Sequence, residues 1–275
     1  MFLRLLKKIF SRFKKNKIKK LGLALGSGGA KGFFHVGALR AFEEEGITFD
    51  VISGSSIGAI VGALYASGFS SSSMVEYFKQ LNLTDPMTLI KMKLSGMTVE
   101  KVLDRAFAGS NIEDLPLPFG AVAVDLYAGT QVDLTSGNTA KAVCASSAIP
   151  PLFKSVEING KMLVDGAFLN NVPADLARKL GADFVLGINL GSNEPTNKNI
   201  LVALTNSYKN HGVKETDRSL MGKNNGDFIF EPNLENYSST SIDKLNELYE
   251  EGYEYAKKVM PEVKKILKRA KIKRG

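Results

Sequence analysis

The sequence predicts an α/β fold in which a mainly parallel sheet is covered by helices on both faces. Short apolar stretches of strand length alternate with longer stretches of helical period along the first two thirds of the chain. Glycine follows several of the helical stretches, at the position where a left-handed residue commonly ends a helix. Such alternation is typical of strands joined by crossover helices. Neither an internal repeat nor a linker divides the chain, so we expect one domain.

The first elements frame two turns. A strand, LGLAL, is predicted at 21–25 and runs directly into a glycine loop, GSGGAKG, at 26–32. A helix follows this loop and ends at Gly46. The second strand, FDVIS at 49–53, leads through another small-residue turn into a helix that extends to about Ser67. The sequence therefore places both turns directly after neighbouring strands.

The middle of the chain is less regular. Residues 70–115 are polar and mixed, with helical patches near 72–81 and 98–108, and we expect them to form a cap over the core. Strands are predicted at 119–126 and 130–136, around a turn that contains glycine.

The last elements are predicted with decreasing regularity. Residues 192–240 are rich in Asn, Ser and Gly and are predicted to form loops. The other predictions are a helix from about Thr139, a hairpin at 155–166 with an Asn159-Gly160 type I′ turn, a helix from Pro173 to Leu180, a strand at 183–190, and a long helix that Ser241 caps and Pro261 kinks.

Composition excludes several kinds of protein. The chain is 44% hydrophobic and 23% charged, which is the balance of an ordinary globular domain. Its single cysteine, Cys144, excludes an intramolecular disulfide framework and suits a reducing compartment, so we expect a cytoplasmic location. Only two histidines, His35 and His211, are present, so a structural zinc site is not expected.

Charge is concentrated at the two ends of the chain. The net charge is +8, yet residues 1–20 and 257–275 each hold nine Lys or Arg, and acidic residues exceed basic ones in between. A protein that binds nucleic acid is normally basic over its body, so no nucleic-acid partner is expected. The chain is thus divided into a basic segment at 1–20, a core at 21–191 and a loop-rich region with a final helix at 192–275.

The N-terminal segment has an amphipathic pattern. Apolar residues recur every three to four positions, with lysine and arginine between them, which suits a helix lying on an anionic membrane. The alternative is a solvated basic tail. The C-terminal lysines also have an explanation other than membrane binding, because basic residues near the C-terminus of a helix stabilise the helix dipole. The uncharged stretch 51–75 has the length of a membrane span, but its many Ser and Gly residues predict a helix buried in a globular core instead.

The glycine loop suits two kinds of site. A glycine-rich turn that opens a helix presents free backbone N–H groups to an anion. A dinucleotide site would need glycine three residues after Gly28, where Lys31 stands, and an acid at the end of the next strand, whereas Asp50 precedes the apolar part of that strand. The other possibility is an oxyanion hole made by consecutive N–H donors. The loop alone does not decide between them.

The second turn carries a serine between glycines, in the order Gly54-x-Ser56-x-Gly58. On a strand–turn–helix this spacing places a hydroxyl at a sharp bend, and the glycines relieve the crowding there. The alternative is plain packing of small residues at the start of a buried helix. The neighbouring Ser55 lacks the glycine spacing.

A nucleophilic serine needs a general base. His35 lies on the first turns of a predicted helix, where a packing role is more typical, and His211 lies in the loop-rich region. A carboxylate is therefore the preferred base, provided that burial raises its pKa. Asp165 is the best placed, at the end of a hairpin strand and followed by Gly166; Asp125 and Asp133 are less well placed.

Together these three motifs resemble the patatin-like phospholipases, in their bacterial-type, single-domain form. GSGGAKG at 26–32, GSSIG at 54–58 and DGA at 165–167 occur in the family's order, and similarity extends through ASSAIPPLFKSVEINGKMLVDGAFLNNVPADLARKLGADFVLGINL. The resemblance covers roughly residues 20 to 190. It implies a three-layer α/β/α sandwich and an acyl hydrolase that uses a Ser-Asp dyad.

The resemblance also implies roles for particular residues. Ser56 would be the nucleophile, Asp165 its base, and Gly28 and Gly29 the oxyanion donors. Residues that would support the three motifs are Lys31, Gly32, Gly54, Gly58 and Gly166. Ser27 departs from the family, in which glycine is common at this position.

The expected function is hydrolysis of phospholipid or lysophospholipid esters through an acyl-enzyme. No metal or organic cofactor is expected, and the expected partners are the lipid substrate and an anionic membrane surface contacted through the basic termini, on the cytosolic face. One alternative is an acyltransferase with the same dyad. Another is a membrane-associated protein that binds an anionic ligand without chemistry. Oligomeric state and positional preference are left open.

Overall fold

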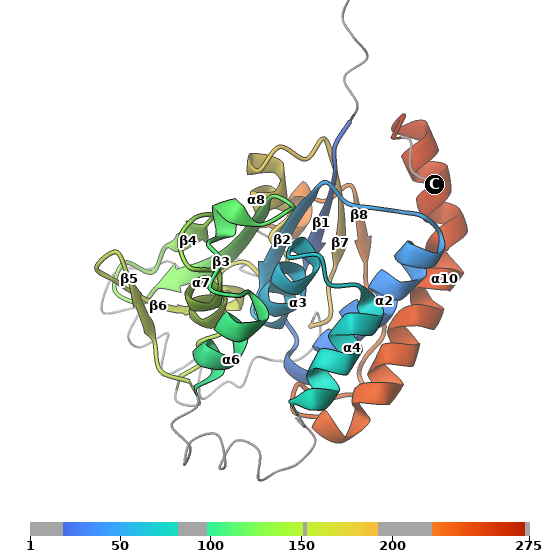
Figure 1. Cartoon of the computed structure of the whole chain (residues 1–275). Helices are drawn as coiled ribbons and strands as arrows, with labels where there is room; N and C mark the ends of the chain where they lie inside the picture. The colour runs from blue at the N-terminus through green and yellow to red at the C-terminus, as the bar shows by residue number, and fades with distance from the viewer. Residues whose placement is uncertain (1–18, 82–97, 151–152, 192–221, 273–275) are drawn as a thin grey trace, which may run out of the picture.

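A central sheet with helices on both faces forms the body of the protein (Figure 1). The structure, a computed structural model, describes residues 19–81, 98–150, 153–191 and 222–272. Within these ranges the strands are β1 (Leu21–Leu25), β2 (Val51–Ser55), β3 (Phe119–Asp125), β4 (Gln131–Leu134), β5 (Val156–Ile158), β6 (Lys161–Asp165), β7 (Phe184–Ile188) and β8 (Phe228–Phe230). The helices are α2 (Phe33–Glu44), α3 (Ile57–Ala66), α4 (Ser71–Gln80), α6 (Val99–Ala106), α7 (Thr139–Ser146), α8 (Ala174–Lys179) and α10 (Leu245–Arg269).

The sheet is mainly parallel, as predicted. Its hydrogen-bonded path is β5-β6-β3-β2-β1-β7-β8, and β4 also pairs with β3. The strands β3, β2, β1, β7 and β8 pair in parallel, whereas β4 and β6 are antiparallel to β3. The predicted hairpin is present, because β5 and β6 are joined through Asn159 and Gly160, both with positive φ.

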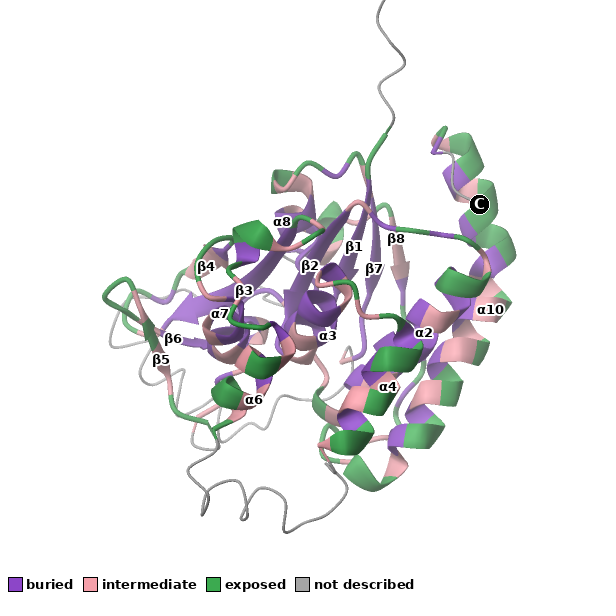
Figure 2. Ribbon diagram, in the orientation of Figure 1, coloured by how far each residue is buried: buried purple, intermediate pink, exposed green. Residues whose placement is uncertain are grey.

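The alternation of large and small residues decides which helices cover which face. In β1, Leu21, Leu23 and Leu25 belong to the main core, which also includes α2, α3, α7 and α10. Ala24 faces a second, smaller core formed with α8. A Cβ on Gly22 would lie 2.7 Å from the Cβ of Ala182, so α8 approaches the sheet closely only where side chains are small. The predicted three-layer α/β/α arrangement is confirmed, with the central strands buried (Figure 2).

Strand β3 brings two distant parts of the chain together. Residues 121–124 pair with β4 along one edge of β3. Residues 119–122 pair with β2 and residues 123–125 pair with β6. Both stretches overlap the β4 pairing, so β2 and β6 must lie on the other edge of β3. One runs parallel to β3 and the other antiparallel, so their carboxyl ends meet.

Helices α2 and α10 run side by side through reciprocal glycine contacts. A Cβ on Gly37 would lie 2.8 Å from the backbone nitrogen of Tyr253, and a Cβ on Gly252 would lie 2.8 Å from the Cα of Phe34. No side chain separates the two backbones at this crossing. The buried side chains of the final helix therefore belong to the main core, and Figure 1 shows α10 lying beside α2.

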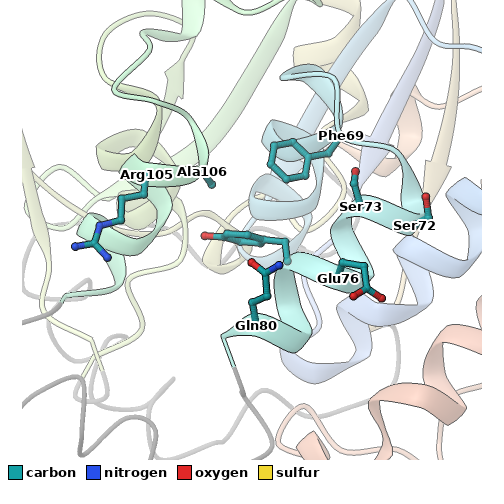
Figure 3. Close-up of a pocket in the computed structure, with 8 residues that line it drawn as sticks. Phe69, Ser72, Ser73, Glu76, Gln80, Arg105 and Ala106 are labelled. Atoms are coloured by element: carbon teal, nitrogen blue, oxygen red, sulfur yellow. The ribbon is translucent and has the colours of Figure 1, made fainter.

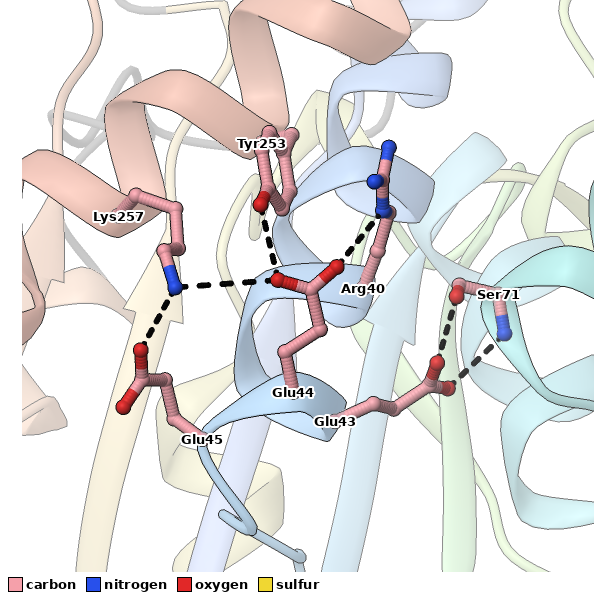
Figure 4. A network of polar contacts seen from close by, with 7 residues as sticks. All are labelled: Arg40, Glu43, Glu44, Glu45, Ser71, Tyr253 and Lys257. Atoms are coloured by element: carbon pink, nitrogen blue, oxygen red, sulfur yellow. Dashed lines mark hydrogen bonds and ion pairs between the residues drawn. The ribbon is translucent and has the colours of Figure 1, made fainter.

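Part of the C-terminal basic run forms internal ion pairs. Glu45, at the end of α2, binds the Nζ of Lys257 at 2.7 Å and the Nζ of Lys264 at 2.6 Å. The neighbouring Glu44 contacts Arg40 and Tyr253, and Glu43 accepts hydrogen bonds from Ser71 at the start of α4 (Figure 4). The acidic triplet thus joins α2 to α10 and α4.

Near the C-terminus one prediction needs correction and another agrees with the structure. Residues 228–230 form strand β8 and not a loop, because Phe228 and Phe230 pack beside β7 at the edge of the sheet. Ser241 is the predicted cap: it precedes a 3₁₀ turn, Ile242–Lys244, which runs directly into α10 at Leu245, and the helix continues through Pro261. The basic segment 1–18 and most of the loop-rich region, 192–221, lie outside the described residues.

The predicted cap is described in part. Helix α6 lies within the second predicted helical patch, α4 begins and ends one residue earlier than the first, and residues 82–97 lie outside the described residues. An open groove of about 600 Å³ runs between the two helices. Figure 3 shows Phe69 and Gln80 beside it, with Arg105 on the opposite side. Among the described helices, none is both long enough and apolar enough to cross a membrane.

Candidate active site

Ser56 occupies a strained turn directly after β2. Its backbone has φ 54° and ψ −123°, in a region that costs about 1–3 kcal/mol for a residue with a side chain. The flanking glycines allow this geometry. A Cβ on Gly54 would lie 2.5 Å from the backbone nitrogen of Ala59, and one on Gly58 would lie 2.6 Å from the carbonyl oxygen of Gly26. Because backbone lies against backbone on both sides, the Gly-x-Ser-x-Gly spacing is required by the fold.

Asp165 lies at the end of β6, where that strand meets β2. Ser55 is in register with Val122 of β3, and Asp165 is in register with the next residue, Ala123. The structure therefore brings Ser56 and Asp165 together, although more than a hundred residues separate them in the sequence. Gly166 is also required here, because a Cβ on it would overlap the carbonyl oxygen of Val122.

The Asp165 carboxyl group is buried, with 1% of the residue exposed. Burial raises its pKa to about 6, against the opposing effects of the Ser56 hydroxyl and the Ala167 N–H. Its Oδ1 accepts the Ala167 N–H at 2.8 Å. Its Oδ2 accepts no hydrogen bond of normal geometry from the described residues. A carboxylate with this pKa and an available oxygen can accept a proton near neutral pH.

The glycine loop lies beside the serine turn. A Cβ on Gly32 would overlap the side chain of Ile57, the first residue of α3. Ala30 donates its N–H to the Ser239 carbonyl at 2.8 Å. By contrast, the N–H groups of Gly28 and Gly29 donate to no acceptor in the described part of the chain. Two consecutive unused donors next to a serine turn can stabilise an anion.

The two basic residues of this region are buried. Only 4% of Lys31 is exposed. His35 is fully buried, and its Nε2 donates to the Gly26 carbonyl at 2.8 Å. Burial lowers the pKa of His35 to about 4, so the ring is neutral at physiological pH and supports the loop. The sequence prediction of a packing role for His35 agrees with this placement, and His211 lies outside the described residues.

Sequence reasoning missed Ser146 and Ala148. The Oγ of Ser146 accepts the Ser56 N–H at 3.0 Å, and the carbonyl of Ala148 accepts the Asp165 N–H at 2.9 Å. Their segment, ASSAIPP, contributed only to the family resemblance. A single sequence holds no signal for such contacts, because the two hydrogen bonds depend on how α7 packs against the sheet.

Asn171 was also missed. Its Oδ1 accepts a hydrogen bond from the Ser27 hydroxyl, and its Nδ2 donates to Asn189 Oδ1 at 2.9 Å. Asn189 in turn donates to Glu231 at 3.2 Å. The residue that departs from the family pattern, Ser27, therefore anchors the glycine loop to the end of β7 and to the segment after β8.

The described residues contain no cluster of three or more His, Cys, Asp or Glu that could hold a metal ion. Cys144 is partly buried, and burial raises the pKa of its thiol to about 12. Its sulfur is therefore protonated at neutral pH and is a poor nucleophile.

Comparison with known proteins identifies the family. The family described as "Patatin-like phospholipase" matches residues 23–178, which is more than half of the chain. The chain belongs to the patatin-like phospholipase family. It is 35% identical over 192 residues to the mouse patatin-like phospholipase domain-containing protein 6, covering 64% of this chain and 14% of that protein.

A second relative and a solved structure agree with this assignment. An uncharacterized NTE family protein of Mycobacterium bovis is 36% identical over 181 residues, covering 64% of this chain and 50% of that protein. The chain thus spans about half or less of the length of these relatives. VipD from Legionella pneumophila has a similar fold, with a TM-score of 0.52 at 16% identity, covering 89% of this chain and 67% of that chain.

Proposed function

We propose that this patatin-like protein hydrolyses phospholipid or lysophospholipid esters through an acyl-enzyme, with Ser56 as nucleophile and Asp165 as general base. The observation that carries the proposal is the meeting of β2 and β6 along β3, which sets a strained serine against a buried carboxyl group. The pKa of that carboxyl, about 6, leaves it ionised at neutral pH and still basic enough to take a proton.

The first half-reaction acylates the serine. Asp165 accepts the hydroxyl proton as Ser56 Oγ attacks the carbonyl carbon of the ester, and the N–H groups of Gly28 and Gly29 stabilise the negative oxygen that forms. The tetrahedral intermediate then expels the alcohol, which takes the proton from Asp165. The products of this step are a free lysolipid or alcohol and an acyl ester on Ser56.

The second half-reaction returns the enzyme to its starting state. Asp165 takes a proton from water, whose oxygen attacks the acyl carbon, and the same two N–H groups stabilise the new oxyanion. The intermediate releases the fatty acid, and the proton returns to Ser56 Oγ. Neither step requires a group outside the chain other than water.

The proposed substrate class, phospholipid esters, is based on the family. The proposed membrane location is based on the charge of the N-terminal segment. Residues 1–20 carry nine basic residues and no acidic one. We propose that they hold the protein peripherally on an anionic membrane on the cytosolic side, because basic amphipathic segments bind such surfaces.

The test is the loss of hydrolysis in Ser56→Ala and Asp165→Asn. Each variant is expected to lower kcat on a soluble short-chain ester about 1000-fold or more, because the nucleophile or its base is removed. Ser55→Ala is the matched control, since the buried Ser55 hydroxyl has no hydrogen-bond partner among the described residues, and it should keep most of the activity.

A fluorophosphonate probe should label Ser56. In the wild type, kcat/KM should rise with pH through about 6, because Asp165 must lose its proton to act as a base. Full activity in either dyad variant, or labelling at Ser55, would refute the dyad. Transfer of the acyl group to an added alcohol with little free fatty acid would show a transferase instead.

A further inference from the structure

One short segment makes hydrogen bonds to both members of the proposed dyad. Ser146 is the last residue of α7 and is fully buried, and its Oγ accepts the Ser56 N–H at 3.0 Å. Two residues later, the carbonyl of Ala148 accepts the Asp165 N–H at 2.9 Å. The segment Ser146–Ala148 is therefore hydrogen-bonded to the serine turn at one end and to the end of β6 at the other.

The sheet alone leaves this junction weakly defined. The ends of β2 and β6 meet on β3 without pairing to each other, since each strand has its own partners there. Ser56 also has a backbone conformation outside the usual regions, which persists only when its surroundings hold it. In the described part of the chain, the Ser146 hydroxyl is the acceptor of the Ser56 N–H. A buried N–H without an acceptor would favour a different peptide orientation at this turn.

We propose that Ser146 is a positioning residue for the reaction, and that the segment Ser146–Ala148 sets the separation between the Ser56 hydroxyl and the Asp165 carboxyl. The inference rests on the proposed function. Ser146 takes no part in bond making; it fixes the turn from which the nucleophile projects. Its loss therefore affects the chemical step and leaves most of the substrate-binding surface in place.

The chain offers a closely matched control. Ser147, the next residue, also has a buried hydroxyl, but this hydroxyl has no hydrogen-bond partner among the described residues. Ser146→Ala and Ser147→Ala remove the same atom from adjacent positions. Only the first removes a hydrogen bond to the serine turn.

The experiment compares these two variants with the wild type on a soluble short-chain ester. Ser146→Ala should lower kcat about 10- to 100-fold, because a misplacement near 1 Å at the reacting atoms has an effect of this size. KM should change less than about twofold. Ser147→Ala should keep kcat within about threefold of the wild type, and the rate of fluorophosphonate labelling at Ser56 should follow kcat in both variants.

The pH profile separates positioning from a general loss of structure. The Ser56 hydroxyl lowers the pKa of Asp165, so moving it away should raise that pKa and shift the acid limb of kcat/KM to higher pH in Ser146→Ala. A merely destabilised protein would keep the wild-type limb. Ser146→Cys, which keeps a weak acceptor of similar size, should be intermediate, and it replaces the alanine variant if that variant does not fold.

The outcomes are distinct from those that test the dyad. If the wild type hydrolyses the ester and Ser56→Ala does not, the proposed function is supported, independently of the result for the Ser146 variants. Wild-type kcat in Ser146→Ala, equal losses in Ser146→Ala and Ser147→Ala, or a loss without a shift of the acid limb would each overturn the positioning role.

Discussion

The two ends of the central sheet are held together by different interactions. At the carboxyl end of β1 and β2, backbone packs against backbone: a Cβ on Gly58 would lie 2.6 Å from the carbonyl oxygen of Gly26, and a Cβ on Gly54 would lie 2.5 Å from the nitrogen of Ala59. At the amino end, where α2 finishes, contact is made by long charged side chains. Glu44 and Glu45 both meet Lys257 of α10 there (Figure 4), and Glu45 also meets Lys264.

The difference follows from what each kind of contact tolerates. Close backbone contacts have no room for an added methyl group and fix the turns that carry Ser56 and the loop N–H groups. Exposed ion pairs adapt to change and are weakened by salt. The end with the candidate site is therefore rigid, and the opposite end is adaptable.

The two ends of the sheet also differ in their position relative to the basic terminal segments. β1 follows Lys20 at the amino end, and α10, which runs beside α2 in the same direction, finishes at that end as well (Figure 1). Lys265, Lys268 and Arg269 are exposed and form no ion pair with the described residues. Both basic segments thus start from the end of the sheet opposite the candidate site. Membrane attachment through them should be separable from ester hydrolysis.

The largest expected effect is that of Gly58→Ala. The new methyl group would overlap the Leu25 and Gly26 carbonyls, so we expect a loss of about 3 kcal/mol or more in the free energy of unfolding and little residual hydrolysis. Gly68→Ala is the control, because its Cβ would meet open space and only the positive φ opposes it, at about 1 kcal/mol. Urea unfolding measures the free energy of unfolding of both variants. Equal losses in the two variants would contradict the conclusion that the end of the sheet with the candidate site is rigid.

A smaller effect is expected from Glu45→Gln at the adaptable end. Hydrogen bonds from Lys257 and then Lys264 lower the pKa of this partly exposed carboxyl to about 2. Ion pairs that stay open to solvent contribute little, so Tm should fall by about 2 °C or less, and added salt should reduce the difference. Glu76→Gln, at an exposed pair with Lys79 on α4, is the control. A large, salt-independent fall in Tm would show that the ion pairs at this end of the sheet are as sensitive to substitution as the backbone contacts at the end with the candidate site.

The smallest effect on catalysis is expected from deletion of residues 2–19. Hydrolysis of a soluble short-chain ester should be unchanged within about twofold, because the tail joins the fold far from the candidate site. Sedimentation with anionic vesicles should decrease, and neutral vesicles serve as the control. Unchanged sedimentation with anionic vesicles would show that the segment is a solvated basic tail that does not bind the membrane. A loss of ester hydrolysis would contradict the separation of the two ends.

Local chemistry made much of the fold predictable. The strands of the parallel sheet before β8, the hairpin at Asn159 and Gly160, and the helix ends near Gly46, Gly68 and Gly181 all agree with the sequence predictions. Strand β8 was missed, because three residues between loop-like sequences carry too little periodicity to stand out. Ser241 agrees with its predicted capping position, at the start of the 3₁₀ turn that runs into α10.

The candidate site divides in the same way. Gly54 meets a local requirement, since its Cβ would overlap the start of α3, whereas Gly58 is required by the carbonyls of Leu25 and Gly26 on the neighbouring β1 and the loop after it. The choice of Asp165 from the sequence rested on its place at the end of a hairpin strand. Nothing in the sequence could show Ser146 beneath the serine turn, or Asn171 behind the glycine loop, because those contacts join elements far apart in the chain.

The sequence by itself determined the order of strands and helices apart from β8, the positions of the turns and the residue types of the candidate site, because periodicity, glycine and serine act over a few residues. The tertiary structure decided that β2 and β6 share one edge of β3, that α7 supports the junction between them, and that lysines of α10 pair with the end of α2. Those choices depend on packing among distant segments, and packing is a property of the whole core.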